Sequence, residues 1–181
     1  MTRYVALLGS INVGGNRLTM AELRAAFEAE GFSNVETVVA SGNVLFDHEE
    51  RPTRGLEEKL ERLVRAKFEM RSIAAVRSAE EIRRAIEDNP FTGFGADNLV
   101  HTMFLDDDAD PAQFRVMVAD YEGRGPEKLA LGDRALYIDY VDGVGNSRLT
   151  NAFIERRLGC RGTARNVRSL ARILAKMEQK D

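Results

Sequence analysis

The stretch Val35–Phe46 reads V-E-T-V-V-A-S-G-N-V-L-F and contains two short runs rich in β-branched and apolar residues. The runs, Val35–Val39 and Val44–Phe46, are separated by Ser41-Gly42-Asn43, residue types that favour a tight turn between antiparallel strands. This stretch therefore predicts a β-hairpin. The segments on either side of it decide which fold it belongs to.

Before the hairpin, the sequence predicts one strand and one helix. Tyr4–Leu8 is a short apolar run that ends at a glycine, as a buried strand does. The helix begins at Thr19, which has Glu22 three residues later. That spacing is typical of a capping box, in which each side chain accepts a hydrogen bond from the backbone N–H of the other residue. Gly31 is expected to end the helix.

After the hairpin, the sequence predicts a helix, a strand and a further helix. The apolar positions of Leu56–Phe68 repeat with helical spacing, and Ile73–Val76 is a short apolar run. Ser78 then stands where a residue would cap the next helix. The order of elements up to this strand is β-α-β-β-α-β, which is the order of the ferredoxin-like unit.

The second half of the chain repeats much of this order. It begins with a strand and a helix opened by Asp110-Pro111, followed by a hairpin around Gly132-Asp133. The predicted elements are strands at Val100–Leu105, Lys128–Leu131, Ala135–Tyr140 and Gly162–Ala164, and helices from Asp110 to about Tyr121, at Asn151–Leu158 and from about Asn166 to Lys176.

We therefore predict an α+β protein made of two ferredoxin-like halves packed into one compact unit, with antiparallel or mixed sheets and helices on one face. Residues 1–89 are expected to form the first half, and residues 98–181 the second half with its C-terminal helix. Residues 90–97 are expected to connect the two halves.

Composition predicts a soluble protein of the cytoplasm. Hydrophobic residues make up 44% of the 181 residues and charged residues 30%. No apolar run reaches the roughly 18 residues of a membrane span, and the N-terminus lacks the apolar segment of a signal peptide. The single cysteine, Cys160, fits a reducing compartment. With only His48 and His101 beside it, no Cys/His metal site is expected, and no cofactor is predicted.

The charge is small and unevenly placed. A net charge of −3 makes nucleic acid an unlikely principal partner, because nucleic-acid-binding domains are usually basic. Residues 104–145 are mainly acidic, whereas the residues after Gly145 are mainly basic. These two blocks either form a surface for a regulatory partner, face each other, or are simply solvated. The oligomeric state is not indicated.

Glycine-rich polar loops lie at several predicted helix starts. The first, within Leu8–Met20, has two glycines spaced as in a P-loop. However, Gly15 and Asn16 stand where that motif needs Lys and Ser or Thr, so it is not a nucleotide-hydrolysing loop. Such loops either hold a phosphate-bearing ligand through backbone N–H groups or only connect the elements. The candidate ligand-binding residues are Asn12, Gly14, Gly15, Asn16, Arg17, Ser41, Asn43, Ser147, Arg148, Thr163, Arg165 and Asn166.

An internal echo links two of these loops. G-G-N-R-L-T-M-A (Gly14–Ala21) is similar to V-G-N-S-R-L-T-N-A (Val144–Ala152). In two ferredoxin-like halves the first would follow strand one and the second strand three. Convergence therefore explains the echo at least as well as duplication.

The leading hypothesis is a binding module for a phosphate-bearing small molecule or nucleic acid. The first alternative is an enzyme that acts on a nucleotide or phosphoester through His101 or a pair of carboxylates. No G-x-S-x-G motif is present, and the catalytic residues of such an enzyme are unknown. The second alternative is a regulatory protein that uses the acidic and basic blocks.

Five motifs together resemble a bacterial family known as domain of unknown function 1697. They follow one another in order through nearly the whole chain. The resemblance implies two ferredoxin-like halves and no established activity, so no catalytic residue is carried over. The chain departs from the family pattern at two places: Gly9-Ser10 stands in place of Arg-Gly, and Val167 in place of Trp. The motifs are Y-V-A-L-L-G-S-I-N-V-G-G-N-R-L-T-M-A-E-L-R, S-G-N-V-L-F, N-P-F, D-G-V-G-N-S-R-L-T-N and G-T-A-R-N.

Overall fold

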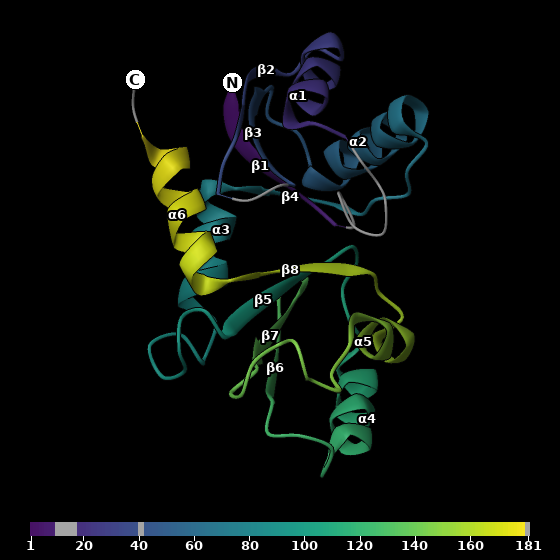
Figure 1. The fold of residues 1–181 in the computed structure, drawn as a ribbon, viewed down its shortest axis with the longest axis vertical. Coiled ribbons are helices and arrows are strands. Elements are labelled where there is room, and N and C mark those ends of the chain that lie inside the picture. The colour runs from purple at the N-terminus through teal and green to yellow at the C-terminus, as the bar shows by residue number, and fades with distance from the viewer. Residues whose placement is uncertain (10–17, 40–41, 180–181) are drawn as a thin grey trace. The chain divides into compact units, whose positions relative to one another are not determined.

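A computed structural model gives the fold and describes residues 1–9, 18–39 and 42–179 (Figure 1). The chain divides into two compact units. The first contains Met1–Ile82 together with Arg172–Asp181, and the second contains Arg83–Ala171. The predicted connection at residues 90–97 stays a prediction. None of the helices in the described part of the chain is long and apolar enough to cross a membrane.

The first unit contains a four-stranded antiparallel sheet with the strand order β2-β3-β1-β4. The predicted hairpin is confirmed: β2 and β3 pair with Glu36 opposite Leu45 and Thr37 opposite Val44. The elements are β1 (Thr2–Leu8), α1 (Met20–Ala29), β2 (Ser33–Thr37), β3 (Asn43–His48), α2 (Thr53–Phe68), β4 (Ala74–Ser78) and the start of α3 (Ala79–Glu87).

The second unit repeats this topology, with the strand order β6-β7-β5-β8. Each strand of the second sheet therefore has a counterpart at the same place in the first. The described residues form two four-stranded antiparallel sheets and six helices, which confirms the predicted fold class. The elements are the end of α3, β5 (Val100–Leu105), α4 (Pro111–Tyr121), β6 (Lys128–Gly132), β7 (Ala135–Asp139), α5 (Asn151–Leu158), β8 (Gly162–Asn166) and the start of α6 (Val167–Glu178). From Arg172 onward, α6 belongs to the first unit.

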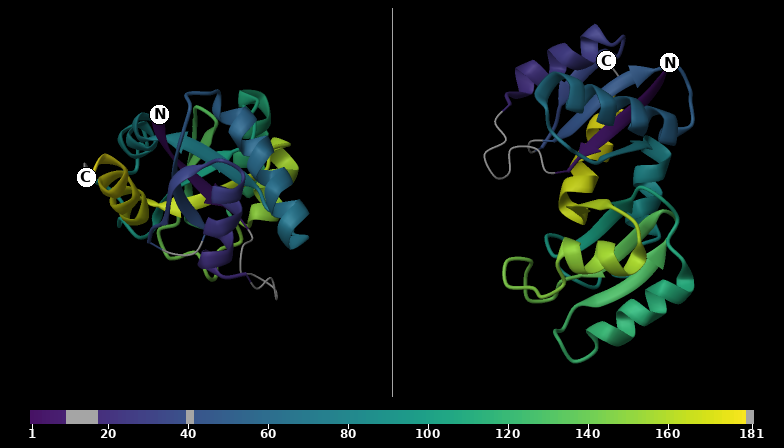
Figure 2. Two further views of the ribbon diagram at one scale, coloured as in Figure 1. Left: turned by 90° about the horizontal axis from the view of Figure 1, so that it is seen from above. Right: turned by 90° about the vertical axis from the view of Figure 1, so that its right-hand side faces the viewer.

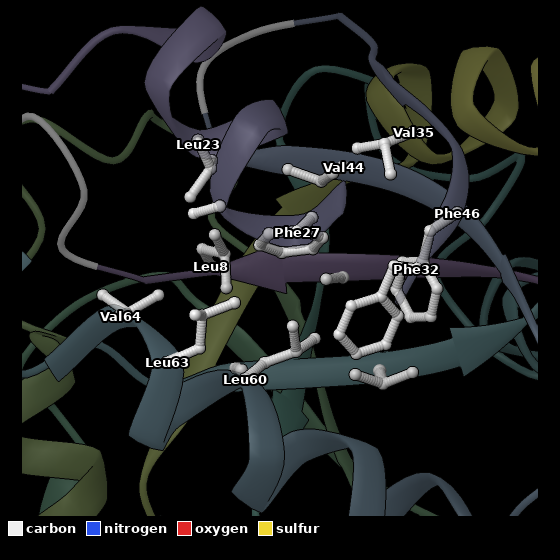
Figure 3. Close-up of a cluster of buried hydrophobic side chains, with 14 of the residues drawn as sticks. Leu8, Leu23, Phe27, Phe32, Val35, Val44, Phe46, Leu60, Leu63 and Val64 are labelled. Atoms are coloured by element: carbon white, nitrogen blue, oxygen red, sulfur yellow. The ribbon is translucent and has the colours of Figure 1, made fainter. Parts of the chain in front are cut away.

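Alternation along the strands builds the core of the first unit. Tyr4 on β1 and Phe46 on β3 point to the same face of the sheet, where they pack with Phe27 of α1 and side chains of α2. Figure 3 shows Phe27 and Phe46 in this cluster. Figures 1 and 2 show α1 and α2 covering this face. Val5 and Leu45 point to the opposite face and are also fully buried. Both faces of this sheet are therefore covered.

The second unit has its own core on the corresponding face of its sheet. Met103 of β5 and Ile138 of β7 pack with Met117 of α4 and Ile154 of α5. All four side chains are fully buried. Each unit thus encloses a separate hydrophobic cluster between its sheet and two helices.

The helix starts agree with the sequence signals. The Thr19 hydroxyl accepts the N–H of Glu22 at 3.1 Å, and the Glu22 carboxylate accepts the N–H of Thr19 at 2.7 Å. Asp110 caps α4 by accepting the N–H of Ala112 at 2.8 Å. The capping residues predicted from the sequence therefore begin these helices in the structure.

Candidate functional site

The candidate residues of the first unit fall into two groups. Asn12, Gly14, Gly15, Asn16, Arg17 and Ser41 lie outside the described residues. Asn43 is the first residue of β3, opposite Leu7, and its side chain is buried. Its carbonyl accepts the N–H of Val38 at 3.1 Å, so its backbone is part of the hairpin.

In the second unit, Ser147 binds an internal carboxylate. Its hydroxyl donates to Glu127 Oε1 at 2.6 Å, and the Tyr121 hydroxyl donates to Glu127 Oε2 at 2.5 Å. Burial and the neighbouring Glu127 carboxylate raise the pKa of Tyr121 to about 12. Burial acts to raise the pKa of Glu127, but the hydrogen bonds from Ser147 and Tyr121 outweigh it and hold that pKa below its ordinary value. The positive charge of Arg148, the residue after Ser147, opposes part of this rise in the pKa of Tyr121.

This carboxylate makes stability depend on pH. Because the pKa of Glu127 is lowered in the folded protein, its contribution to stability is present above the ordinary value of 4.5 and is lost as pH falls through the folded value. Glu127→Gln is expected to lower the free energy of unfolding by about 1 kcal/mol at pH 7 and by clearly less at pH 3. Urea unfolding at both pH values measures the difference, with the exposed Glu122→Gln as control. A cost that is the same at both pH values would contradict this role.

The residues Thr163, Arg165 and Asn166 come together on β8. The Arg165 guanidinium donates from Nη1 to Thr163 Oγ1 at 2.8 Å and to the Ala164 carbonyl at 2.9 Å. Burial lowers the pKa of Arg165 to about 10. The Asn166 side chain accepts the N–H of Ser169 at 2.8 Å and so caps α6. The polar loop that was expected before the last helix is instead part of a strand, because β8 extends to Asn166, two residues beyond the predicted strand.

The sheet order separates these residues from Ser147. Ser147 is bonded to Glu127, the residue before β6, and β6 and β8 are the two edges of the same sheet. Neighbouring strands lie about 4.8 Å apart, so these edges are separated by about 14 Å. The structure therefore groups Thr163, Arg165 and Asn166 but does not bring Ser147 to them. A ligand-binding role for these residues stays a prediction.

The arginine at the equivalent place in the first unit, Arg77, is buried, and sequence reasoning missed it. Arg77 on β4 donates from Nη1 to Glu57 Oε1 at 2.7 Å and to the Val76 carbonyl at 2.8 Å. The next residue, Ser78, caps α3 by accepting the N–H of Glu81. Arg77-Ser78 and Arg165-Asn166 thus occupy the same place in the two repeats. An arginine followed by a helix-capping residue, at the end of an edge strand in both halves, is the sequence signal that could have identified Arg77.

The echo between Gly14–Ala21 and Val144–Ala152 does not mark equivalent positions. The first leads into α1, which follows β1, whereas the second leads into α5, which follows β7. In the repeat, α1 corresponds to α4, and α5 corresponds to α2. The prediction that the echo joins non-equivalent places is confirmed.

The side chains considered for catalysis have structural surroundings. His101 Nδ1 lies 3.0 Å from the Leu99 carbonyl, the ring packs edge-on against Tyr140, and burial lowers the pKa of His101. The ring of His48 is buried against Phe32. Burial, together with Asp106, Asp107 and Asp108, raises the pKa of Cys160, which disfavours the thiolate. The described residues contain no group of three or more His, Cys, Asp or Glu that could hold a metal ion.

A charged cavity of about 430 Å³ lies in the first unit, between the strand ends and the last turns of α6. Since Tyr4 and Phe46 point into the core, their neighbours Arg3 and Asp47 point to the other face of the sheet, where the cavity lies. The lining residues are Arg3, Asn34, Val35, Glu36, Asp47, Lys176, Met177 and Gln179.

The Glu36 carboxylate lies between two cations of this cavity. Arg3 Nη2 donates to Glu36 Oε1, and Lys176 Nζ lies 3.7 Å from Glu36 Oε2. Arg3 Nη1 also donates to the Asn34 carbonyl at 2.6 Å and to Asp47 Oδ1 at 3.2 Å. Arg3 is therefore held firmly in one position.

Lys176 is the more adaptable of the two cations. Its ammonium donates to Gln179 Oε1 at 3.1 Å, and 41% of its side chain is exposed. Sequence reasoning found neither Arg3 nor Lys176, because they lie near opposite ends of the chain and no local motif contains them. In the sequence, Lys176 stands out only as the end of the last predicted helix, within the basic residues that follow Gly145.

Comparisons with known proteins identify relatives but not a ligand. A family model described as "Protein of unknown function (DUF1697)" matches residues 1–137. Among solved structures, the chain is similar to the conserved bacterial protein SP0830 from Streptococcus pneumoniae, with 24% sequence identity, a TM-score of 0.75 and 99% of each chain covered. This likeness shows the fold alone. No curated protein matches the chain.

Proposed function

This chain belongs to the DUF1697 family of proteins of unknown function, and on that premise we propose that it is a binding module for a phosphate-bearing small molecule. The phosphate binds in the charged cavity of the first unit. The observation that carries this proposal is the position of the Glu36 carboxylate between Arg3 and Lys176. An internal anion occupies the place that the phosphate of a ligand would take.

The phosphate binds by replacing the Glu36 carboxylate as the partner of Arg3 and Lys176. Arginine and lysine are the usual protein partners of phosphate, and both line this cavity. The Glu36 side chain is 35% exposed, so its ion pairs are worth only about 0–1 kcal/mol each. A phosphate dianion displaces such a carboxylate at little cost. The cavity volume lies within the range of about 300–1,000 Å³ that small-molecule sites occupy.

The lining favours a small molecule over nucleic acid. Glu36 and Asp47 contribute two negative charges to a cavity with two positive charges, and the whole chain has a net charge of −3. A polyanion would meet these carboxylates at several points, whereas one phosphate group can contact the cations alone. Neither His101 nor Cys160 lines the cavity, which favours binding over catalysis. The glycine-rich loops are the alternative binding site for the same ligand. Arg17 belongs to the first of these loops.

A ligand screen tests this function. We expect a sugar phosphate or nucleotide to raise the melting temperature, since a ligand at 100 times its Kd adds about 2.7 kcal/mol of stability. The panel contains inorganic phosphate, sugar phosphates, nucleotides and a single-stranded oligonucleotide. If no member shifts the melting temperature, the proposed function is wrong. A preference for the oligonucleotide would contradict the small-molecule assignment.

Substitutions locate the site. Lys176→Met is expected to weaken binding of the best compound about tenfold, because a charge-assisted hydrogen bond is lost. Glu36→Gln is expected to strengthen binding several-fold, because it removes the competing carboxylate. Isothermal titration calorimetry measures both, with Lys128→Met, on an exposed strand end of the second unit, as the matched control. Loss of binding in Arg17→Met but not in Lys176→Met would place the site at the first glycine-rich loop instead.

A further inference from the structure

The charged cavity shares two residues with a second hollow of a different character. This hollow, an open groove of about 580 Å³, also lies in the first unit. Lys176 and Gln179 line both. The two hollows therefore adjoin each other at Lys176 and Gln179. The groove is lined by Val38, Val39, Arg172, Ala175, Lys176, Glu178 and Gln179.

The groove offers an apolar surface where the charged cavity offers ion pairs. Val38 and Val39 follow β2 along the chain, and Ala175 faces them from α6. Long side chains such as Arg172 add aliphatic stems to such a wall while their charged ends stay in water. Val39 has a φ of 65°, a conformation that β-branched residues rarely adopt. Backbone positions of this kind are found preferentially at ligand sites.

From this arrangement we infer that the ligand is an amphipathic phosphate ester, a phosphate attached to an aromatic or aliphatic body. The inference rests on the proposed function, because the phosphate binds at Arg3 and Lys176. The apolar body lies in the groove against Val38, Val39 and Ala175. Lys176 stands at the junction, where the phosphate joins the body.

The apolar part of the groove, formed by Val38, Val39 and Ala175, disfavours a body rich in hydroxyl groups. Each hydroxyl placed against Val38 or Ala175 would lose its hydrogen bonds to water and gain none, which disfavours binding. An apolar ring at the same place removes apolar surface from water on both sides. At about 25 cal/mol per Å², covering about 60 Å² corresponds to roughly a tenfold gain in affinity.

Four probes test the inference by calorimetry: inorganic phosphate, ribose 5-phosphate, 1-naphthyl phosphate and 1-naphthol. We expect 1-naphthyl phosphate to bind about tenfold more tightly than ribose 5-phosphate, and 1-naphthol to bind much more weakly than its phosphate ester. Ala175→Glu places a negative charge in the groove. The affinities of this variant for the two phosphate esters are expected to differ by no more than about twofold. Ribose 5-phosphate should bind this variant about as well as the wild type.

Controls separate the two proposals. Ala175 is exposed on α6, so the substitution leaves the core intact. Ala119→Glu makes the same change at an exposed position of α4. It should leave the preference for 1-naphthyl phosphate over ribose 5-phosphate unchanged. Equal affinity of the wild type for the two phosphate esters would overturn the amphipathic ligand while the proposed function stands. Equal binding of 1-naphthol and 1-naphthyl phosphate, or no binding of any probe, would overturn both.

Discussion

Phe46→Ala is expected to lower the free energy of unfolding of the first unit by about 3–5 kcal/mol. The ring of Phe46 is fully buried, and its centroid lies 4.8 Å from that of Phe32, 5.8 Å from Tyr4 and 6.0 Å from Phe27. Removing it leaves a cavity among side chains of the sheet and α1 that cannot all move to fill it. Domains are usually stable by only about 5–15 kcal/mol, so much of this margin is lost.

Urea unfolding followed by circular dichroism measures this effect, and amide hydrogen exchange in β1 and β3 assigns it to the first unit. Phe94→Ala is the matched control, because 91% of the Phe94 side chain is exposed. The control is expected to change stability by less than about 0.5 kcal/mol. Equal effects of the two substitutions would show that the aromatic cluster does not hold the sheet.

Glu57→Gln is expected to lower the free energy of unfolding by a similar amount, about 3–5 kcal/mol, because it removes the charge that balances Arg77. The side chains of Glu57 and Arg77 are only 7% and 5% exposed, and Glu57 Oε1 accepts both the Arg77 guanidinium at 2.7 Å and the Val76 N–H at 3.0 Å. The amide keeps the shape and an acceptor but removes the negative charge. The positive charge of Arg77 is then left in a poorly solvated place.

Two further variants distinguish charge from packing. Glu61 lies one turn along α2 and accepts the N–H of Ala74 at 3.1 Å, but it is only half-buried. Glu61→Gln is therefore expected to cost only about 1 kcal/mol. The double variant Glu57→Leu/Arg77→Met should recover most of the loss, because an apolar pair of similar volume needs no charge compensation. If the double variant is as unstable as Glu57→Gln, packing and not charge explains the cost.

Local signals were sufficient for most of the fold. The capping box at Thr19, the Asp110-Pro111 helix start and the hairpin after Val35 each depend on residues within a few positions of one another, and the structure confirms all three. The length of β8 was underestimated because its last residues, Arg165 and Asn166, are polar. Pairing with β5, where Arg165 lies opposite Thr102, extends the strand. No local pattern contains that pairing.

The candidate sites also divide into features that local sequence predicts and features that depend on distant residues. Glycine-rich loops can be found in a sequence because their conformation is a local property. What Ser147 binds cannot be found in this way, because its partner Glu127 lies just before β6, and the Tyr121 hydroxyl that binds the same carboxylate comes from α4. The hydroxyl that was a ligand candidate in the sequence has an internal carboxylate in the structure.

The sequence by itself determined which segments form helices and strands, the repeated order of these elements and therefore the two ferredoxin-like halves. These properties follow from backbone hydrogen bonding and from the periodicity of apolar residues, which act over a few positions. Only the tertiary structure decided that Glu36 lies between Arg3 and Lys176, and that Arg77 is buried with Glu57. Charges interact through space, and their partners are set by which strand ends and helix turns the packing of the core brings together.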